Sequence, residues 1–359
     1  MILIVIGTRP EIIKMSPVMR ECVKKDLDFA VLHTGQHYSY DMDRIFFDQL
    51  DLAHPDYNLD VGSGTHGIQT AAILTGVEKI LLEHPPGIVL VQGDTNTVCA
   101  GALAAAKLHI PVGHVEAGLR SFDRSMPEEI NRIIADHISD RLFAPTEISR
   151  QNLLHEGIAA EKITKTGNTI VDALQQNIQI GRQKVHPLED LTLEPGGYFL
   201  VTAHRAENVD NHNRLAEILA GLRNISECFG LPVVFPMHPR TRKMVHEFSL
   251  STDGIRVIDP VGYLEFLMLE SKATLVLTDS GGVQEESCIL SVPCVTLREN
   301  TERPETIDTG SNMLAGTNPE KILSSVKEMI NIPRTWNNPF GTGDAARRII
   351  EVCEKTGTL

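Results

Sequence analysis

The stretch MILIVIGTRPEIIK, residues 1–14, decides the fold class. An unbroken apolar run from Met1 to Ile6 ends at Gly7, and a helix-like pattern begins beside Pro10. Such a run is typical of a strand buried on both faces of a parallel sheet, and proline is favoured where a helix starts. Further runs of this kind are DFAVLHT from Asp28, GIVLVQG from Gly87, IPVGHVE from Ile110 and DRLFAPT from Asp140. Helix-like stretches alternate with these runs, which predicts an α/β fold.

The same cycle of strand and helix starts again after Pro195. Its apolar runs are GYFLVTAH, LPVVFPMH, IRVIDP, ATLVLTDS and VPCVTL. Residues 181–197 between the two cycles are rich in proline and glycine and have no clear period, so we place the domain boundary there. The sequence therefore predicts two Rossmann-like, doubly wound domains that face each other across a cleft. We expect them at residues 1–180 and 196–342, with 343–359 as a C-terminal helix that could pack back on the N-terminal domain.

Composition excludes several classes of partner. The 33 basic and 47 acidic residues give a net charge of −14, which argues against nucleic acid or an anionic membrane surface. The six cysteines are scattered without a C-x-x-C pair, so we expect buried free thiols. The apolar start is too short for a signal-peptide core or a membrane span, and we expect a cytoplasmic protein. The histidine spacing matches no common metal motif, so we expect no catalytic metal.

In an open parallel sheet, ligands bind beyond the carboxyl ends of the strands. Arg9 and Lys14 follow the first strand and could clamp a phosphate or a carboxylate. Asp94 and Glu116 each follow a later strand, and Glu128 opens a helix. Taken singly, each carboxylate fits a capping or helix-dipole role. Together they predict a cluster suited to acid/base chemistry, because neighbouring carboxylates raise one another's pKa.

The second cycle carries a phosphate-binding pattern. Ser280, Gly281 and Gly282 lie between an apolar run and a helix-like stretch, where backbone and helix N-terminus can hold a diphosphate. Glu286 falls one helical turn further and could bond a ribose diol. His204, which closes the first strand of this cycle, could assist a leaving phosphate. His238 closes the next strand, and the charged segment around Arg303 could line the same cleft. Arg303 therefore joins the candidates for substrate binding.

The motifs together resemble those of the non-hydrolysing UDP-N-acetylglucosamine 2-epimerases. They are GTRPEIIKMSP, VLVQGDTNT, GHVEAGLRS, MPEEINR, TGNTIVDAL, TAHRAEN, TDSGGVQEES and TERPE, in this order from Gly7 to Glu305. The resemblance implies a GT-B-like fold, a homodimer, and interconversion of UDP-GlcNAc and UDP-ManNAc without NAD or metal. In the family's chemistry UDP leaves C1 while the C2 proton is removed, and UDP then adds back to a 2-acetamidoglucal.

The resemblance also implies roles for single residues. Asp94, Glu116 and Glu128 form the acid/base group, and which of them is the base stays open. His204 assists at the departing diphosphate. The residues expected to bind substrate are Arg9, Lys14, Arg132, His238, Ser280, Gly281, Gly282, Glu286 and Arg303.

Two alternatives remain at this point. The loop Gly62–Gly67 and the stretch SFDRSMPEE also resemble epimerases of UDP-2,3-diacetamido sugar acids. A GT-B glycosyltransferase or a UDP-sugar-binding protein is the alternative from another class, although mere binding of an anion gains nothing from three carboxylates. The segment Gly35–Tyr40 and the stretch Gln69–Ile73, which has no arginine, depart from the bacterial pattern for an allosteric UDP-GlcNAc site.

Overall fold

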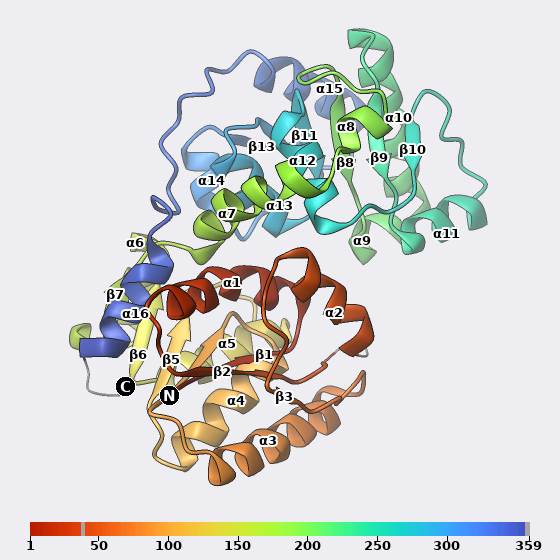
Figure 1. Ribbon diagram of the computed structural model, residues 1–359. Coiled ribbons are helices and arrows are strands. Elements are labelled where there is room, and N and C mark those ends of the chain that lie inside the picture. Colours follow the sequence, from red (N-terminus) through yellow and green to blue (C-terminus); the bar gives the residue numbers. More distant parts are fainter. Residues whose placement is uncertain (37–39, 356–359) are drawn as a thin grey trace. The chain divides into compact units, whose positions relative to one another are not determined.

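The computed structural model describes residues 1–36 and 40–355 of the chain (Figure 1). The chain divides into two compact units. The first comprises Met1–Gln176 and the chain from Phe340 onward, and the second comprises Asn177–Pro339. The segment Gly35–Tyr40 departs from the family pattern. Its central residues, 37–39, lie outside the described residues.

The first unit is built on a parallel sheet with the strand order β3-β2-β1-β4-β5-β6-β7. Its strands are β1 (Ile2–Ile6), β2 (Phe29–His33), β3 (Tyr57–Asn58), β4 (Ile88–Gln92), β5 (Val112–Val115), β6 (Arg141–Ala144) and β7 (Ile163–Lys165). Its helices are α1 (Arg9–Lys24), α2 (Tyr40–Gln49), α3 (His66–Glu83), α4 (Asn96–Lys107), α5 (Pro127–Ile138), α6 (Glu147–His155) and α16 (Ala345–Lys355). Helix α7 (Thr169–Lys184) runs from the first unit into the second.

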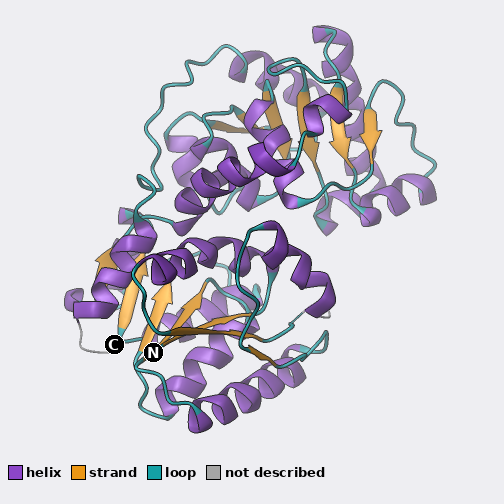
Figure 2. Cartoon of the chain, viewed as in Figure 1, coloured by secondary structure: helices purple, strands orange, loops and turns teal. Residues whose placement is uncertain are grey.

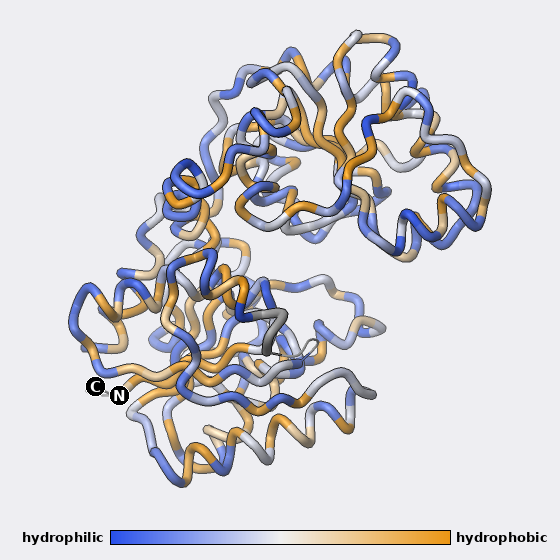
Figure 3. The backbone as a smooth tube through the Cα atoms, turned by 45° about the vertical axis from the view of Figure 1, so that its right-hand side comes forward, coloured by the Kyte–Doolittle hydropathy of each residue, from blue (hydrophilic) through white to orange (hydrophobic). Residues whose placement is uncertain are grey.

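Alternation along β1 explains how this unit forms its core. Leu3 and Val5 point to one face, where they pack in a single cluster with apolar side chains of α3, α4 and α5. The strand's other apolar side chains point to the opposite face and are equally buried, with no exposed surface on Ile2, Ile4 or Ile6. Both faces of the sheet are therefore covered, as the continuous apolar runs predicted, and the strands appear as the hydrophobic segments in Figure 3.

The second unit repeats this plan with the strand order β10-β9-β8-β11-β12-β13 (Figure 2). Its strands are β8 (Phe199–Thr202), β9 (Val233–Pro236), β10 (Arg256–Ile258), β11 (Leu275–Thr278), β12 (Cys294–Thr296) and β13 (Asn312–Leu314). Its helices are α8 (Pro187–Asp190), α9 (Ala206–Val209), α10 (His212–Phe229), α11 (Pro239–Glu247), α12 (Tyr263–Lys272), α13 (Gly281–Ile289), α14 (Pro304–Asp308) and α15 (Pro319–Met329). Phe199 and Val201 pack with α10 and α15, and Leu200 packs with α12 on the other face.

The α/β fold with two Rossmann-like sheets is confirmed, and every strand pair within the described residues is parallel. The sequence analysis missed the edge strands β3, β7 and β13, because runs of two or three residues carry little pattern. The division between units lies at Gln176, inside α7, rather than in residues 181–197. Gly181 sits against Met268 of α12, so this part of the chain packs into the second unit.

The free cysteines match the prediction except at Cys228, which is exposed. Within the described ranges, no helix has the length and apolar character that crossing a membrane requires.

The strand order fixes where each unit can bind a ligand. In both sheets the order in which successive strands are added reverses at the centre, between β1 and β4 in the first unit and between β8 and β11 in the second. At such a switch point the following helices leave toward opposite faces, and a crevice opens at the carboxyl ends of the strands. The segments after β1 and β4, and after β8 and β11, contain most of the residues that the sequence singled out.

Docking of α16 on the first unit depends on one buried carboxylate. Asp172 of α7 accepts hydrogen bonds from the backbone N–H of Ala345 and Ala346, at 3.2 and 3.1 Å, and so caps α16 from outside the helix. We predict that Asp172→Ala lowers the free energy of unfolding by about 1–2 kcal/mol, because two helix N–H groups lose their acceptor.

Denaturant unfolding measures this loss. Lys25→Ala is the control, since it removes only a surface ion pair of α16 with Glu354 and should change stability far less. Equal losses in the two variants would contradict the capping role.

Candidate functional site

Glu116 is the most constrained of the predicted carboxylates. It follows β5 directly and has a φ of +69°, a conformation that residues other than glycine seldom adopt. Lys14 of α1 donates to both carboxylate oxygens, at 2.6 and 2.7 Å, and Gln92 at the end of β4 donates to Oε2. A strained backbone held by several partners is a feature that concentrates at functional sites. Lys14, predicted to hold phosphate or sugar, thus contacts a candidate acid/base residue.

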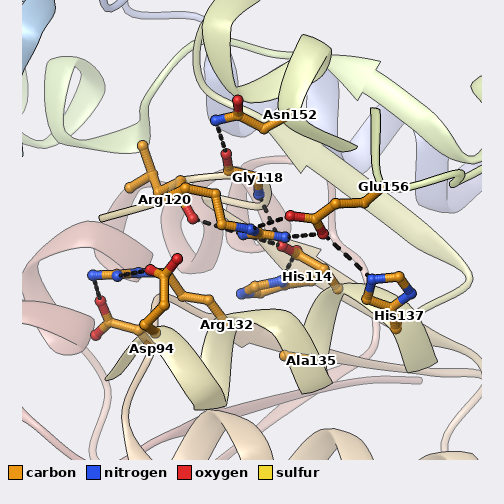
Figure 4. Close-up of polar contacts among 12 residues, drawn as sticks. Asp94, His114, Gly118, Arg120, Arg132, Ala135, His137, Asn152 and Glu156 are labelled. Atoms are coloured by element: carbon orange, nitrogen blue, oxygen red, sulfur yellow. Dashed lines mark hydrogen bonds and ion pairs between the residues drawn. The ribbon is translucent and has the colours of Figure 1, made fainter. Parts of the chain in front are cut away.

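Asp94 stands at the switch point, after β4. The cap of α4 is Thr95, whose hydroxyl accepts from the backbone N–H of Val98, so Asp94 is not needed for capping. Its carboxylate instead accepts from Arg132 of α5 at 2.5 Å (Figure 4). Its backbone carbonyl accepts from Asn131 at 3.0 Å. The side chain of Asp94 remains 30% exposed, which leaves it accessible to a ligand.

The first turn of α5 carries two adjacent glutamates with different environments. Glu128 is exposed, and its helical spacing places it on the same side of α5 as Asn131 and Arg132, which contact Asp94. Glu129 is 2% exposed and accepts from Arg132 and from the backbone N–H groups of Ser121 and Phe122. Glu128 is therefore free to face a ligand, and Glu129, which the sequence analysis did not single out, holds the preceding loop.

Glu11 is a second carboxylate that the sequence analysis did not assign. It is buried beneath the segment after β1 and accepts from the backbone N–H groups of Gly7 and Thr8 and from the hydroxyl of Thr95. Burial raises its pKa to about 7, although these hydrogen bonds oppose the shift. Glu11 thereby joins the segment after β1 to the segment after β4 at the switch point.

Arg9 occupies the start of α1, where the sequence placed it. Its guanidinium lies over the ring of Phe46 of α2, 5.0 Å from the ring centroid, and the residue is partly exposed. Gly7 just before it cannot carry a side chain, because a Cβ atom would lie 2.2 Å from the hydroxyl oxygens of both Thr34 and Thr97. These contacts fix the chain at the strand end and leave Arg9 as a cation at the ligand edge.

A hollow of about 480 Å³ lies beside these residues in the first unit. It is lined mainly by apolar atoms of α3 and α5, with Asn96 and Asn131 among its polar members. The same Asn131 holds the backbone of Asp94, so the hollow adjoins the carboxylate cluster. The stretch Gln69–Ile73, which departs from the family pattern, lies in α3, where buried Gln69 donates to backbone carbonyls at Gln36 and Gly62.

In the second unit a buried aspartate organises the switch point. Asp279 follows β11 with no exposed surface, and it accepts from the backbone N–H groups of His204 and Arg205 and from the amide of Asn208. The segment after β8 is thus tied to the segment after β11. The imidazole of His204 is 44% exposed, and its Nδ1 lies 3.6 Å from Oδ1 of Asp279. Its ring centroid lies 6.0 Å from that of His238. Burial and the nearby His204 lower the pKa of His238.

The predicted diphosphate loop forms the start of α13. Ser280 is the residue before the helix, its hydroxyl caps no helix N–H, and Gly281 and Gly282 form the first turn. A Cβ atom on Gly282 would meet little besides the Ser280 hydroxyl, at 3.9 Å, so the backbone there is open to a ligand. Unoccupied N–H groups at a helix start favour an anion. The loop lies between a strand and a helix, as the sequence predicted, and its binding of a diphosphate stays a prediction.

Two carboxylates near this loop are already neutralised by arginines. Arg298 binds Glu302 through both terminal nitrogens, at 2.9 and 2.8 Å, and thereby lowers the pKa of Glu302 to about 2. Arg303, predicted to bind substrate, lies 2.7 Å from Glu285 of α13. Pairing of this kind keeps negative charge near the loop from repelling a phosphate.

Glu286 stands one turn inside α13 next to a fully buried glutamate, Glu270 of α12. Burial and the carboxyl of Glu286 both raise the pKa of Glu270 well above its ordinary value. The hydroxyl of Ser287 donates to Glu270 at 2.8 Å. The expected ribose-binding carboxyl therefore lies next to a buried carboxyl with a raised pKa.

Comparison with known proteins identifies the family. Residues 20–354 match the sequence profile of the UDP-N-acetylglucosamine 2-epimerases. The chain is 56% identical over 356 residues to the UDP-N-acetylglucosamine 2-epimerase of Methanocaldococcus jannaschii, with 97% of each chain covered. The chain belongs to the UDP-N-acetylglucosamine 2-epimerase family. The predicted resemblance is thereby confirmed, and the chain is an enzyme, an epimerase, rather than a transferase or a binding protein.

Solved structures of the family share the fold over the whole chain. The M. jannaschii epimerase in complex with UDP-GlcNAc and UDP has a TM-score of 0.88 at 55% identity, with 99% of each chain covered. Among the relatives found by sequence, the UDP-2,3-diacetamido-2,3-dideoxy-D-glucuronate 2-epimerase of Pseudomonas aeruginosa is 42% identical over 360 residues, with 99% of each chain covered. The GT-B-like fold expected from this family is confirmed.

In the part of the epimerase that the structure describes, no group of three histidine, cysteine or carboxylate side chains is arranged to hold a metal ion. The expectation that the enzyme needs no metal remains a prediction.

The contrast between Glu128 and Glu129 gives a test of the site's structure. We predict that Glu129→Gln lowers the free energy of unfolding by about 2–3 kcal/mol at neutral pH, because a buried acceptor for Arg132 and two backbone N–H groups is lost. Burial alone would raise the pKa of Glu129, but these donors hold it below its usual range. The stabilisation is therefore present above about pH 4.3 and is lost as pH falls through the lowered pKa.

Urea unfolding at several pH values measures this difference. Glu128→Gln is the matched control and should leave stability nearly unchanged, since that side chain is exposed. A stability loss in Glu128→Gln equal to that in Glu129→Gln would contradict the assignment.

Proposed function

We propose that the enzyme interconverts UDP-GlcNAc and UDP-ManNAc by inverting carbon C2 of the sugar. The observation that carries the proposal is the 56% identity, over 97% of both chains, to the M. jannaschii UDP-N-acetylglucosamine 2-epimerase. Identity to the Pseudomonas aeruginosa epimerase of a diacetamido sugar acid is lower, at 42%. UDP-GlcNAc is therefore the first candidate substrate, and a UDP-2,3-diacetamido sugar acid is the second.

The proposed reaction is an elimination followed by re-addition. A carboxylate removes the proton from C2, the bond between C1 and the diphosphate oxygen breaks, and UDP leaves with the bonding electrons. The intermediate is UDP with 2-acetamidoglucal. A diphosphate oxygen then bonds to C1 while C2 receives a proton on the opposite face, which gives the epimer. Acid and base groups near two faces of the sugar suit this chemistry, and the oxidation state never changes.

The residues divide this work between the two units. Asp94, Glu116 and Glu128 supply the proton transfers, and Lys14 and Arg132 hold Glu116 and Asp94, respectively, in place. The start of α13, from Ser280 to Gly282, binds the diphosphate, and Glu286 binds the ribose. His204 and Arg9 supply positive charge or a proton to the departing diphosphate. Arg303 and His238 support the nucleotide side, and the active enzyme is a homodimer.

Isotope exchange tests the reaction. We predict that enzyme incubated with UDP-GlcNAc in deuterated water places deuterium at C2 of both epimers, because each turnover returns a solvent-derived proton to that carbon. Proton NMR follows the loss of the C2 signal. The same incubation with the UDP-2,3-diacetamido sugar acid ranks the two substrates by turnover. Absence of exchange with either sugar would overturn the proposal.

Substitution of the carboxylates tests their roles. We predict that Asp94→Asn, Glu116→Gln and Glu128→Gln each reduce turnover by at least about 100-fold, the usual scale of a lost acid or base. Each change is nearly isosteric, so circular dichroism should show an intact fold. Glu147→Gln, on the exposed start of α6, is the control and should retain full turnover. Near-native rates in all three variants would remove the carboxylates from the mechanism.

A further inference from the structure

A buried network of charged side chains lies next to the proposed acid/base residues, within the first unit (Figure 4). At its centre is His114 of β5, two residues before Glu116, with no exposed surface. Its Nδ1 lies 2.7 Å from Oδ1 of Asp136, and its Nε2 lies 2.8 Å from the backbone carbonyl oxygen of Gly93.

The geometry fixes the protonation state of this imidazole. Both neighbouring groups are acceptors, and a neutral imidazole has only one N–H to donate. Asp136 cannot supply the missing proton, because it also accepts from Arg120 at 2.7 Å and from the backbone N–H of Gly118 at 3.2 Å, which keeps it ionised. Both contacts of His114 are hydrogen bonds only when the ring carries two protons.

The charges around the ring balance. Burial lowers the pKa of His114, but the Asp136 carboxylate, the Gly93 carbonyl and Glu116 raise it more, so the pKa lies above its ordinary value. Burial raises the pKa of Asp136, whereas His114 and Arg120 hold it below its usual range. Arg120 in turn binds Glu156, the residue directly after α6, through Nε and Nη2, each at 2.7 Å. The network thus pairs two cations with two anions, as buried charges require.

The network forms hydrogen bonds to both segments that carry the proposed acid/base residues, the one after β4 and the one after β5. Through the Gly93 carbonyl it holds the residue that precedes Asp94. Asp136 also accepts from the backbone N–H of Gly118, which lies in the turn that begins at Glu116. Asn152 of α6 donates to the backbone carbonyl of the same glycine at 3.0 Å. Gly118 has no room for a side chain, since a Cβ atom would lie 2.3 Å from the backbone oxygen of Ser149.

We propose that His114 is a positioning residue for the epimerisation: a buried imidazolium that ties the segment after β4 to the segment after β5 and so sets the placement of Asp94 relative to Glu116. Its meaning for catalysis rests on the proposed function of those two carboxylates. Loss of either ring proton breaks one of the two ties. The link between the segments therefore holds only while the ring is charged.

This assignment has a definite pH dependence. A histidine whose pKa is raised by folding contributes stability that is fully present below about pH 6.5 and is lost as pH rises through the higher folded pKa. The charged groups that face or adjoin the ring are Asp136, Arg120, Glu116 and Glu156. We therefore expect the turnover of the wild-type enzyme to fall on the alkaline side as His114 loses its second proton.

The test combines a direct measurement of the proton with a variant. Nitrogen-15 NMR of histidine-labelled wild-type enzyme should show one ring, missing from His114→Gln, with both nitrogens protonated at neutral pH. That variant should turn over between about 10- and 100-fold more slowly, the scale expected when reacting groups shift by a fraction of an ångström to about an ångström. The alkaline fall attributed to His114 should be absent from its pH profile. A neutral His114 ring at neutral pH in the wild-type enzyme would overturn the proposal even if the variant failed to fold.

His137→Gln is the matched control. His137 touches the same Glu156, at 3.3 Å, but lies at the exposed rim of the network, so turnover and its pH profile should not change. Normal turnover in His114→Gln, with Asp94→Asn and Glu116→Gln inactive, would refute the positioning role and leave the proposed function standing. Normal turnover in all of these variants would instead refute the proposed function.

Discussion

Parallel pairing of strands, with a reversal of strand order at the centre of each sheet, is the constraint on which the rest of this structure depends. Parallel strands need helical crossovers, and the crossovers leave toward opposite faces on the two sides of β1 and β4, and again of β8 and β11. The carboxyl ends of these strands are consequently left uncovered by helix, and a ligand can reach them. Every proposed acid/base or diphosphate-binding residue except Glu128 lies in a segment or helix that begins at one of the strand ends in these sheets.

Burial of charge is the main cost of placing reactive groups at these strand ends. An unpaired carboxylate buried beside a sheet costs several kcal/mol, and several buried or partly buried carboxylates here have specific donors. Lys14 donates to Glu116, Arg298 donates to Glu302, and three donor groups bond Asp279. The partners also fix geometry, because a carboxylate with several fixed donors has one favourable position. The same contacts that make these charges tolerable therefore preorganise them.

In the proposed function the two units have different roles. The first unit concentrates carboxylates paired with cations near a partly exposed edge, which suits proton transfer. The second unit offers a helix start with two glycines and an aspartate-clamped turn that carries His204, which suits binding of an anion. Members of the epimerase family retain this fold, with a TM-score of 0.88 to the M. jannaschii enzyme in complex with UDP-GlcNAc and UDP.

The sequence by itself determined the α/β class, the principal strands and the strand ends at which Asp94, Glu116, His204 and the Ser280–Gly282 loop stand, because burial on both faces of a strand leaves a local apolar pattern. It could not supply the partners of these groups. Lys14 meets Glu116 across 102 positions, and His204 meets Asp279 across 75. The sequence analysis selected Glu128 as a candidate but did not distinguish it from its buried neighbour Glu129. It also gave no role to His114, whose position in an apolar strand has no distinctive pattern. Only tertiary structure decided these points, since the pKa and the position of a charged group depend on which donors the fold brings within hydrogen-bonding distance.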